Sequence, residues 1–322
     1  MATQLHPEDP HRDLFLSYLR SQPQKVAEMR LVLAIATAGR PAIVAETLRD
    51  IARQSRRPDF VILSVSGPED LDEACLDQLP FPCMVVTGHK GASVQRNRAI
   101  ATLGRDDIVL FLDDDFLMAP DYVEQTLALF DANPDIMVAT GRVIADGILG
   151  PGMQFQEGRD RIRAVPRRAA SADLRMEETY NGYGCNMAVR AQPLIEHEIR
   201  FDESLPLYAW LEDVDLSRRL SAHGRIVRSG AMRGVHLGTK TGRTPGVKLG
   251  YSQMANPVYL MRKGTMAPKR ALAQMGRNLA SNVVKSVRPE PWVDRRGRLR
   301  GNLMALIDVA LRRDTPERIL RM

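Results

Sequence analysis

The chain has 322 residues, of which 44% are hydrophobic and 26% are charged, and its formal net charge is +6. This length and composition are those of an ordinary globular protein; they exclude a largely disordered chain and allow one large α/β domain with an extension. No run of apolar residues approaches the roughly 18–20 that a membrane-spanning helix needs. The N-terminus does not have a basic segment followed by an apolar one, as a secretory signal does, and the three cysteines lack CxxC spacing. We therefore expect a soluble cytoplasmic protein with reduced thiols.

Short apolar runs alternate with segments of helical periodicity from residue 31 to about residue 140. This alternation predicts an α/β fold with a doubly wound, mostly parallel sheet. The predicted strands are 31–40, 60–67, 83–88 and 107–115, and the predicted helices between them are 41–54 and 93–104. Because parallel strands end at one edge of such a sheet, where ligands bind, Thr37–Arg40, Ser64–Gly67 and Asp113–Asp115 should line one crevice.

The pattern changes after residue 145. The Gly- and Arg-rich stretch over 145–178 predicts a long surface loop. Residues 187–191 are expected to return to the sheet, and 213–224 predict a helix that ends at a glycine. From Tyr251 the chain has helical periodicity to its end.

Basic residues gather toward the C-terminus. Residues 238–250 combine four glycines and one proline with Lys240, Arg243 and Lys248, which is typical either of a mobile lid or of a soluble loop. From Arg262 onward there are 15 Lys and Arg against 5 Asp and Glu, a balance of +10. This basic region is either a solvated helical face or a surface for anionic lipid headgroups or a phosphorylated acceptor. It lacks the aromatic and basic interleaving of nucleic-acid readers, so no nucleic-acid partner is expected.

Three consecutive carboxylates, Asp113, Asp114 and Asp115, follow an apolar strand in FLDDDF. Adjacent carboxylates repel one another unless a cation lies among them, and oxygen ligands of this kind suit Mg²⁺ or Mn²⁺, which also bridge diphosphate oxygens. The alternative is a solvated acidic turn that caps the next helix. The apolar character of the strand argues for the metal site.

Two later motifs carry ionisable side chains. Glu212 and Asp213 stand where an aromatic, apolar segment meets a helix, so they either cap that helix or supply a general base. His236 lies in GVHLG, with a basic segment beyond it. It is either a structural histidine or the third member of a metal site with Asp113 and Asp115.

The order of these features resembles the family 2 glycosyltransferases, which have the GT-A fold. An apolar strand ends in ATAGR, GASVQRNRAI (91–100) is similar to the family's Gly-x3-Ala-Arg-Asn-x-Ala pattern with Gln95 in place of an Ala, and FLDDD matches its DxD element. YGCNMAVR (183–190), FDE (201–203), WLEDVDLSRRL and GVHLG follow in the family's order. The resemblance covers about residues 30–240.

The resemblance implies a GT-A catalytic domain over 30–240. The residue pattern outside it predicts a helical N-terminal extension over 1–29 and a lid plus basic helical region over 241–322. The resemblance implies Mn²⁺ or Mg²⁺ at Asp113, Asp115 and His236. It also implies that Asp213 is the catalytic base and that Glu212 helps to orient the acceptor. The residues implied to contact the nucleotide-sugar donor or to shape the sugar and acceptor region are Thr37, Arg40, Ser66, Arg96, Asp113, Asp114, Asn186 and Trp210.

The function implied by the resemblance is inverting, metal-dependent transfer of a sugar from a nucleotide-diphosphate donor to a hydroxyl of a saccharide or lipid-linked saccharide. The resemblance and the basic C-terminal region together imply a role in surface polysaccharide or glycolipid synthesis at the inner membrane face. A Gln-x-x-Arg-Trp motif and membrane spans, which processive members share, are absent, so single additions are favoured. Ser64 and Ser66 stand where the family often has a base-reading Asp, and Asp70 is displaced, so uracil, guanine and thymine all stay open.

Two other functions stay open. A sugar-phosphate nucleotidyltransferase also uses a nucleotide, Mg²⁺ and an α/β sheet, although ATAGRPAIV is a poor match to the Gly-rich loop of such enzymes. A non-catalytic nucleotide-sugar-binding partner is the second alternative. It is disfavoured because Asp115, Asp213 and His236 are all present.

Overall fold

A computed structural model describes residues 3–4, 29–165, 175–241 and 244–322. Apart from the short strand β1 (Thr3–Gln4) and Met29, the expected N-terminal helical extension lies outside the described residues. The chain divides into two compact units. One takes its described residues from Met1–Lys90, Val94–Arg200 and Leu220–Thr241, and the other from Gly91–Ser93, Phe201–Arg219 and Gly242–Met322.

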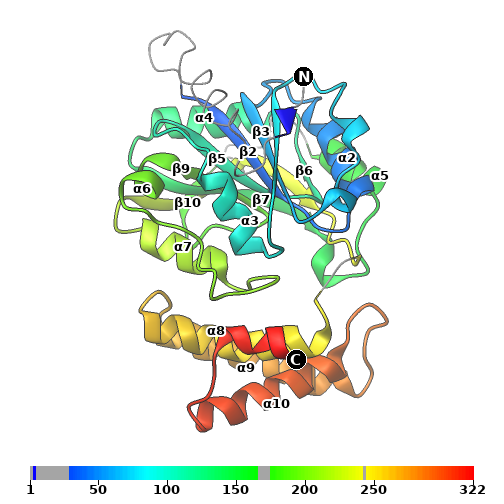
Figure 1. Ribbon diagram of the computed structural model, residues 1–322, viewed down its shortest axis with the longest axis vertical. Helices are drawn as coiled ribbons and strands as arrows, with labels where there is room; N and C mark the ends of the chain where they lie inside the picture. Colours follow the sequence, from blue (N-terminus) through cyan, green and yellow to red (C-terminus); the bar gives the residue numbers. More distant parts are fainter. Residues whose placement is uncertain (1–2, 5–28, 166–174, 242–243) are drawn as a thin grey trace. The chain divides into compact units, whose positions relative to one another are not determined.

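The first unit is built on one mixed, mostly parallel sheet (Figure 1). Among the described residues the strand order is β1-β4-β3-β2-β5-β9-β7-β10-β6, with β8 also paired to β10. Neighbours from β1 to β5 in this order are parallel, β9 is antiparallel to both β5 and β7, and β10 is parallel to β7. The remaining bounds are β2 Leu31–Ala36, β3 Phe60–Val65, β4 Cys83–Thr87, β5 Ile108–Asp113, β6 Phe116–Met118, β7 Ile136–Asp146, β8 Met176–Glu178, β9 Asn186–Arg190 and β10 Arg225–His236.

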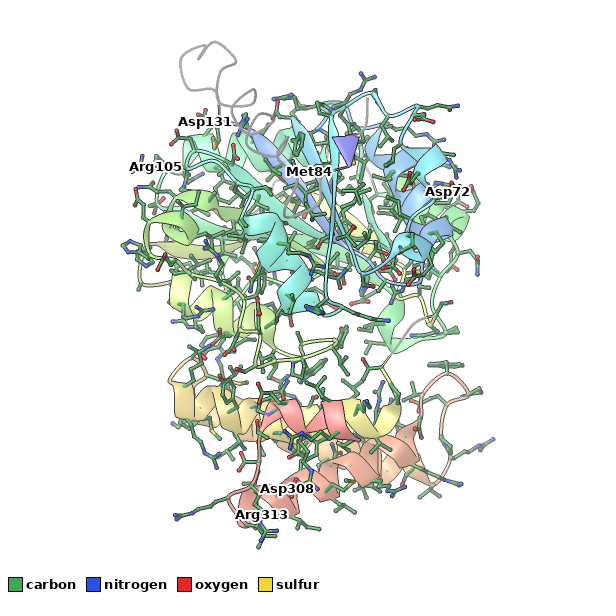
Figure 2. All side chains as sticks on the ribbon, viewed as in Figure 1. Asp72, Met84, Arg105, Asp131, Asp308 and Arg313 are labelled. Carbon is green, nitrogen blue, oxygen red and sulfur yellow. The ribbon has the colours of Figure 1, made fainter. Side chains whose placement is uncertain are left out.

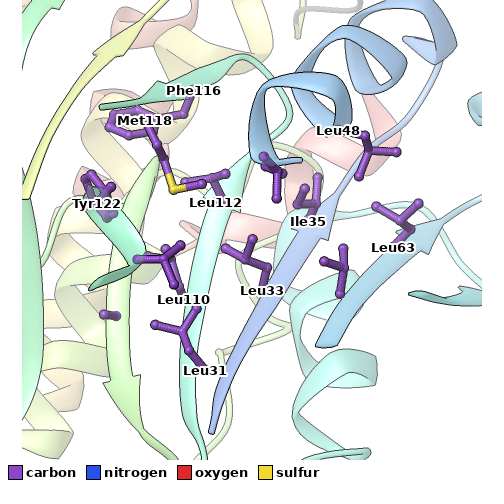
Figure 3. Packing of buried hydrophobic residues seen from close by; sticks show 14 of the residues in the cluster. Leu31, Leu33, Ile35, Leu48, Leu63, Leu110, Leu112, Phe116, Met118 and Tyr122 are labelled. Atoms are coloured by element: carbon purple, nitrogen blue, oxygen red, sulfur yellow. The ribbon is translucent and has the colours of Figure 1, made fainter. Parts of the chain in front are cut away.

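The main core lies on the central strands of this sheet. Leu33 and Ile35 of β2 and Leu110 and Leu112 of β5 belong to one cluster with Leu48, and each is at most 1% exposed (Figure 3). A parallel strand covered on both faces must be apolar at every position, which is why these strands were predictable as continuous apolar runs. Each fully buried side chain of this size contributes about 1.5–3 kcal/mol. The predicted fold class and all four predicted strands are confirmed.

Helices of the first unit pack by apolar residues at helical spacing. In α2, Pro41 occupies the first turn, and Val44, Leu48 and Ile51 are buried.

The predicted surface loop over 145–178 is wrong in part, because β7 continues to Asp146 and α5 packs against a small apolar cluster. The helix bounds are α2 Pro41–Ile51, α3 Ala92–Ile100, which begins in the other unit, α4 Tyr122–Ala132, α5 Phe155–Ala164 and α6 Ala191–Glu196.

The second unit is helical. Its helices are α7 Glu212–Leu220, which confirms a predicted helix, α8 Gly246–Lys263, α9 Pro268–Ser286 and α10 Arg295–Ala310, followed by the 3₁₀ segment η4 Pro316–Arg321. Tyr251 and Met254 of α8 pack with Ala305 of α10, and a Cβ on Gly301 would clash with the Val247 carbonyl, so these helices need glycine to approach closely. α8 begins at Gly246, so residues 246–250 of the expected lid are helical.

No helix among the described residues has the length and apolar character that crossing a membrane would demand.

Candidate active site

Three candidate metal ligands meet at one edge of the sheet in the first unit. Asp113 ends β5, Asp115 follows two residues later, and His236 is the last residue of β10. The register of β10 brings His236 opposite Phe116 on one side and opposite Asp146 on the other. One ligand atom from each of Asp113, Asp115 and His236 lies within 4.8 Å of the others. The structure therefore brings together the three residues predicted to bind metal.

The charges in this cluster are strongly coupled. His236 Nε2 is 3.4 Å from Asp115 Oδ1 and 3.9 Å from Asp113 Oδ2, and His236 Nδ1 is 2.9 Å from Asp146 Oδ1. Burial opposes a charge on His236, but its bonds to Asp115 and Asp146 outweigh burial and raise its pKa to about 10. Burial also opposes ionisation of Asp115, yet the bond to His236 holds the Asp115 pKa below its usual range. The cluster therefore attracts positive charge.

The donor set of this cluster fits a divalent cation. Two carboxylates offer the hard oxygen ligands that Mg²⁺ and Mn²⁺ prefer, and an imidazole nitrogen suits the softer ion of the two. Asp115 is already oriented, because its Oδ2 accepts a 2.7 Å hydrogen bond from the Thr239 amide. The side chain of Asp113 is 32% exposed, so the cluster opens to an incoming ligand.

Asp146 is a positioning residue that the sequence analysis missed. It ends β7 and faces His236 Nδ1, and its Oδ2 accepts a 2.9 Å hydrogen bond from the Tyr183 hydroxyl. A carboxylate behind a metal-binding imidazole fixes the ring's orientation. The residue was missed because it lies at the start of the Gly-rich stretch that predicted a loop, whereas its position depends on pairing between β7 and β10.

Asp114 points toward the turn after β2. Its carboxylate accepts hydrogen bonds from Thr37 Oγ1 at 2.7 Å and Arg40 Nη1 at 2.8 Å, and its carbonyl accepts from Thr47 Oγ1 at 2.6 Å. Burial raises the Asp114 pKa to about 7, against the lowering effect of Arg40. Asp114 therefore joins the acidic turn to the β2–α2 turn, and a direct contact of Asp114, Thr37 or Arg40 with a nucleotide stays a prediction.

The ends of β2 and β3 are joined by Asp70, the acid that stands away from the base-reading position implied by the resemblance. Its carboxylate accepts from the amides of Gly39 at 2.5 Å, Ser66 at 2.7 Å and Gly67 at 3.1 Å, and from Ser66 Oγ at 2.6 Å. Burial opposes its charge, but these hydrogen bonds prevail and lower the Asp70 pKa. Gly39 has φ +69°, a conformation that favours glycine. Asp70 thus fixes the turn in which Ser66 lies.

Gln95 of α3 joins the ends of β2 and β3. Its Nε2 donates to the carbonyls of Thr37 and Ser64, both at 2.7 Å, and the residue is 3% exposed. The motif usually has an alanine at this position, so the glutamine was the feature of the sequence that could have indicated this role. Together with the bonds of Asp70 and Asp114, these contacts show that the residues after β2, β3 and β5 lie next to one another, and the ligand crevice between them stays a prediction.

Arg96 and Asn186 occupy buried positions beside the acidic cluster. Arg96 is 6% exposed and donates to Asp113 Oδ1 and to the Gly184 carbonyl, each at 3.0 Å. Asn186 is fully buried, and its Oδ1 accepts from Thr140 Oγ1 and, at 3.2 Å, from the Gly141 amide. Asn186 therefore links β9 to β7. Its Nδ2 lacks a hydrogen-bond partner among the described residues, and a contact of Asn186 with the donor stays a prediction.

A cavity of about 620 Å³ lies on the first unit next to Tyr183. Thr140 and Gly141 of β7 form part of its wall, so it adjoins the strand that Asn186 holds. Three arginines, Arg142, Arg175 and Arg228, line it together with a single acid, Glu177, which pairs with Arg228. The cavity is therefore net basic.

The predicted base lies in the second unit. Glu212 and Asp213 form the first turn of α7, where the helix dipole favours negative charge, and the Trp210 carbonyl before them accepts a 2.8 Å hydrogen bond from Asn256 Nδ2. The turn that leads into α7 is strained, since three non-glycine residues have φ between +53° and +76°. These are Leu207, Ala209 and Leu211.

α7 is anchored to the end of α8 by a buried carboxylate. Asp215 is fully buried and accepts from Lys263 Nζ at 2.9 Å and Thr265 Oγ1 at 2.8 Å, and it pairs with Arg219 at 2.8 Å. Lys263 Nζ also contacts Asp202 at 2.5 Å. Removal of a partner from such a buried charge is costly, so this network holds the helix that carries Asp213.

The basic residues of the expected lid have separate positions. Lys240 Nζ donates to the carbonyls of Gly147 and Ile148, both at 3.1 Å. Lys248 lies in the first turn of α8, and Arg243 lies outside the described residues.

Comparisons with known proteins identify a family and several relatives of the chain. The sequence profile described as "Glycosyl transferase family 2" matches residues 33–197. A glucosyl-dolichyl phosphate glucuronosyltransferase of Haloferax volcanii is 26% identical over 158 residues, and the match spans 47% of this chain and 49% of the relative, so the chain matches about half of that protein's length.

Two solved structures share the fold. The mannosyltransferase PcManGT from Pyrobaculum calidifontis, in complex with GDP-Man and Mn²⁺, matches with a TM-score of 0.53 and 15% identity over 93% of this chain and 92% of its own. Staphylococcus aureus TarS 1–349, in complex with UDP-GlcNAc, matches with a TM-score of 0.54 and 15% identity over 90% and 83%.

Proposed function

The chain belongs to glycosyl transferase family 2, and we propose that it transfers a sugar from a nucleotide-diphosphate donor to an acceptor hydroxyl, with inversion and with a divalent metal. The observation that carries this proposal is the cluster of Asp113, Asp115 and His236 at the ligand-binding edge of the sheet. Support also comes from the solved relatives, whose complexes contain GDP-Man with Mn²⁺ and UDP-GlcNAc.

In this proposal the acidic cluster binds the diphosphate end of the donor. Asp113, Asp115 and His236 are the residues that would hold the metal, and Asp146 fixes the imidazole of His236. A bound Mn²⁺ or Mg²⁺ would stabilise the negative charge that grows on the leaving diphosphate. Arg96, already aimed at Asp113, supplies further positive charge next to that group.

The nucleoside end of the donor is proposed to lie in the crevice bordered by Thr37, Arg40 and Ser66. Asp70 is engaged by four hydrogen bonds from this turn, so its role is to shape the crevice. The backbone near Ser66 would then discriminate between bases, and uracil, guanine and thymine remain candidates.

The reaction step is proposed to involve Asp213. Asp213 removes the proton from the acceptor hydroxyl as its oxygen attacks the anomeric carbon from the face opposite the leaving group. The new C–O bond forms as the bond to the diphosphate breaks, through an oxocarbenium-like state, so the anomeric configuration inverts. Glu212 helps to orient the acceptor, and Trp210 shapes the acceptor region, as the resemblance implies.

The acceptor is proposed to be a saccharide or lipid-linked saccharide, and the basic cavity beside Tyr183 is a candidate binding place for an anionic group on it. Arg228→Ala would then raise the KM for an anionic acceptor and leave the KM for the donor unchanged. Equal KM values for that acceptor in Arg228→Ala and the natural protein would reject this placement.

Product analysis tests the proposed reaction. The purified protein is incubated with UDP-, GDP- and dTDP-sugars and Mn²⁺, with and without saccharide acceptors, and the released nucleotide is identified. Release of a nucleoside diphosphate with formation of an inverted glycoside is expected. A parallel incubation supplies a nucleoside triphosphate and a sugar 1-phosphate, and release of pyrophosphate there, with none of the expected glycoside in the first incubation, would instead identify a nucleotidyltransferase.

A further inference from the structure

Exposed apolar side chains are concentrated in the C-terminal helices of the second unit. Of the twelve large hydrophobic residues that are exposed among the described residues, nine lie between Pro268 and Met322. They are Leu272, Val283, Val284, Val287, Trp292, Leu303, Ile307, Leu311 and Leu320. Such a concentration in one part of a protein indicates an interaction surface, whereas single exposed apolar residues are ordinary.

α9 presents a continuous apolar face. Leu272, Val283 and Val284 are 61%, 48% and 72% exposed, and Val287, at the end of the helix, is 82% exposed. With the exposed small residues Ala273, Gly276 and Ala280, they fall on one side of the helix at spacings of three, four, seven and eleven residues. Arg277 is exposed along one border of this face, and Arg288 is exposed just past the end of the helix.

α10 carries a second exposed stripe. Leu303, Ile307 and Leu311 follow one another at intervals of four residues and are 51%, 59% and 53% exposed. Arg296 and Arg300 extend the same stripe toward the start of the helix and are also exposed. The stripe is therefore basic at one end and apolar at the other.

The charge of these helices is one-sided. Residues 268–322 contain 13 Lys and Arg against 5 Asp and Glu, a balance of +8. Most of the acids have partners within the unit: Glu290 pairs with Lys285 and Arg295, Asp308 is buried against Tyr251, and Asp314 pairs with Arg262. Exposed cations remain at the ends of α10, including Arg312 and Arg313; Arg313 and the buried Asp308 are labelled in Figure 2.

We propose that the exposed faces of α9 and α10 form a docking surface for an anionic lipid bilayer, on which the protein lies peripherally. We call this the α9–α10 surface, defined by Leu272, Val283, Val284, Val287, Arg296, Arg300, Leu303, Ile307 and Leu311. Helices that combine an apolar face with basic borders lie in the interface plane of a membrane, and anionic lipids attract the cations. A second copy of the chain, equally rich in cations here, would meet like charge, so charge complementarity selects the lipid. The proposal goes beyond sugar transfer and does not depend on it.

Vesicle flotation with the full chain tests the proposal. Vesicles of phosphatidylcholine alone are compared with vesicles that contain phosphatidylglycerol, at low and high salt. Binding to the anionic vesicles that weakens with salt is expected, with little binding to the neutral ones.

Two variants separate the apolar and basic contributions. Val284→Asp/Val287→Asp and Arg296→Ser/Arg300→Ser alter exposed side chains, and each is expected to weaken binding to anionic vesicles about tenfold or more. Leu149→Asp is the matched control, because Leu149 is 84% exposed in the other unit, and it should bind as the natural protein does. Circular dichroism and nucleotide binding establish that each variant is folded.

Three results would overturn the proposal. One is equal binding of the natural protein and both double variants to anionic vesicles. Another is the absence of vesicle binding by the natural protein. The third is a stable dimer in solution that dissociates in Val284→Asp/Val287→Asp and does not bind vesicles, which would assign the surface to a second copy of the chain.

Discussion

His236 Nδ1 lies 2.9 Å from Asp146 Oδ1, across the parallel strands β10 and β7. The pairing of two strands that are distant in sequence thus places a carboxylate behind the imidazole and leaves Nε2 facing Asp113 and Asp115. The proposed metal site therefore depends on strand register as much as on its own three side chains.

Asp146→Asn tests this dependence. The amide cannot stabilise the imidazole as a carboxylate does, so the affinity for Mn²⁺ should fall about 10–100-fold while the fold is kept. Calorimetric titration of Mn²⁺ measures the change. Asp131→Asn is the matched control, since Asp131 is exposed on α4 (Figure 2); unchanged affinity in Asp146→Asn would refute the positioning role.

Gln95→Ala tests the junction of β2 and β3. The substitution removes the donor to the Thr37 and Ser64 carbonyls and leaves buried acceptors less well satisfied, so the free energy of unfolding should fall by about 1–3 kcal/mol. Urea denaturation measures it. A denaturation midpoint equal to that of the natural protein would show that the junction does not need Gln95.

Lys263→Met tests the anchor of α7. The substitution removes the cation between Asp202 and the buried Asp215, so we expect a loss of about 2–4 kcal/mol in unfolding free energy. Lys285→Met, which removes an exposed pair with Glu290, should cost less than about 1 kcal/mol and serves as control. Equal losses in the two variants would contradict the anchor.

Lys263→Met should also change how the free energy of unfolding depends on pH. Burial opposes ionisation of Asp202, but its bonds to Lys263 and Tyr259 prevail and lower its pKa. A lowered folded-state pKa adds stability above the unfolded value, and this stability is lost as the pH falls toward the folded value. The difference between Lys263→Met and the natural protein should therefore shrink from about pH 7 to about pH 3. A difference that grows on acidification would reverse this assignment.

Asp213→Asn tests the proposed base. If Asp213 accepts the proton of the acceptor, kcat should fall about 10²–10⁴-fold with nucleotide binding retained, because general-base contributions have this size. Comparison with Glu212→Gln separates proton transfer from orientation of the acceptor. Asp213→Asn should mainly lower kcat, whereas Glu212→Gln should mainly change the KM for the acceptor. Full activity of Asp213→Asn would exclude Asp213 as the base.

The sequence predicted the parts of the fold that depend on local pattern. The strands that end near Thr37, Ser64 and Asp113 are continuous apolar runs, and His236 was paired with the acidic turn through the family resemblance. β10 was not predicted, because glycines and arginines interrupt its apolar pattern and it forms by pairing with β6, β7 and β8. α5 was not predicted either. It packs on the small apolar cluster mainly through Phe155 and Ile162, and two apolar residues are too few to give a helical pattern in the sequence.

The positioning residues escaped prediction for the same reason. Asp146 and Gln95 act on partners 90, 58 and 31 residues away in the chain, and only the assembled sheet brings those groups together. The strained turn before Asp213 was also invisible, because Leu207, Ala209 and Leu211 give no sequence signal of positive φ.

Thermal unfolding with UDP, GDP and dTDP, each with and without Mn²⁺, tests the central claim most directly. A ligand that binds only the folded state raises the apparent stability. We predict that one nucleotide raises the unfolding temperature only when Mn²⁺ is present, and that Asp115→Ala abolishes this shift. A folded natural protein whose unfolding temperature is moved by no nucleotide, or is moved equally without metal and in Asp115→Ala, would contradict a metal-dependent donor site at Asp113, Asp115 and His236.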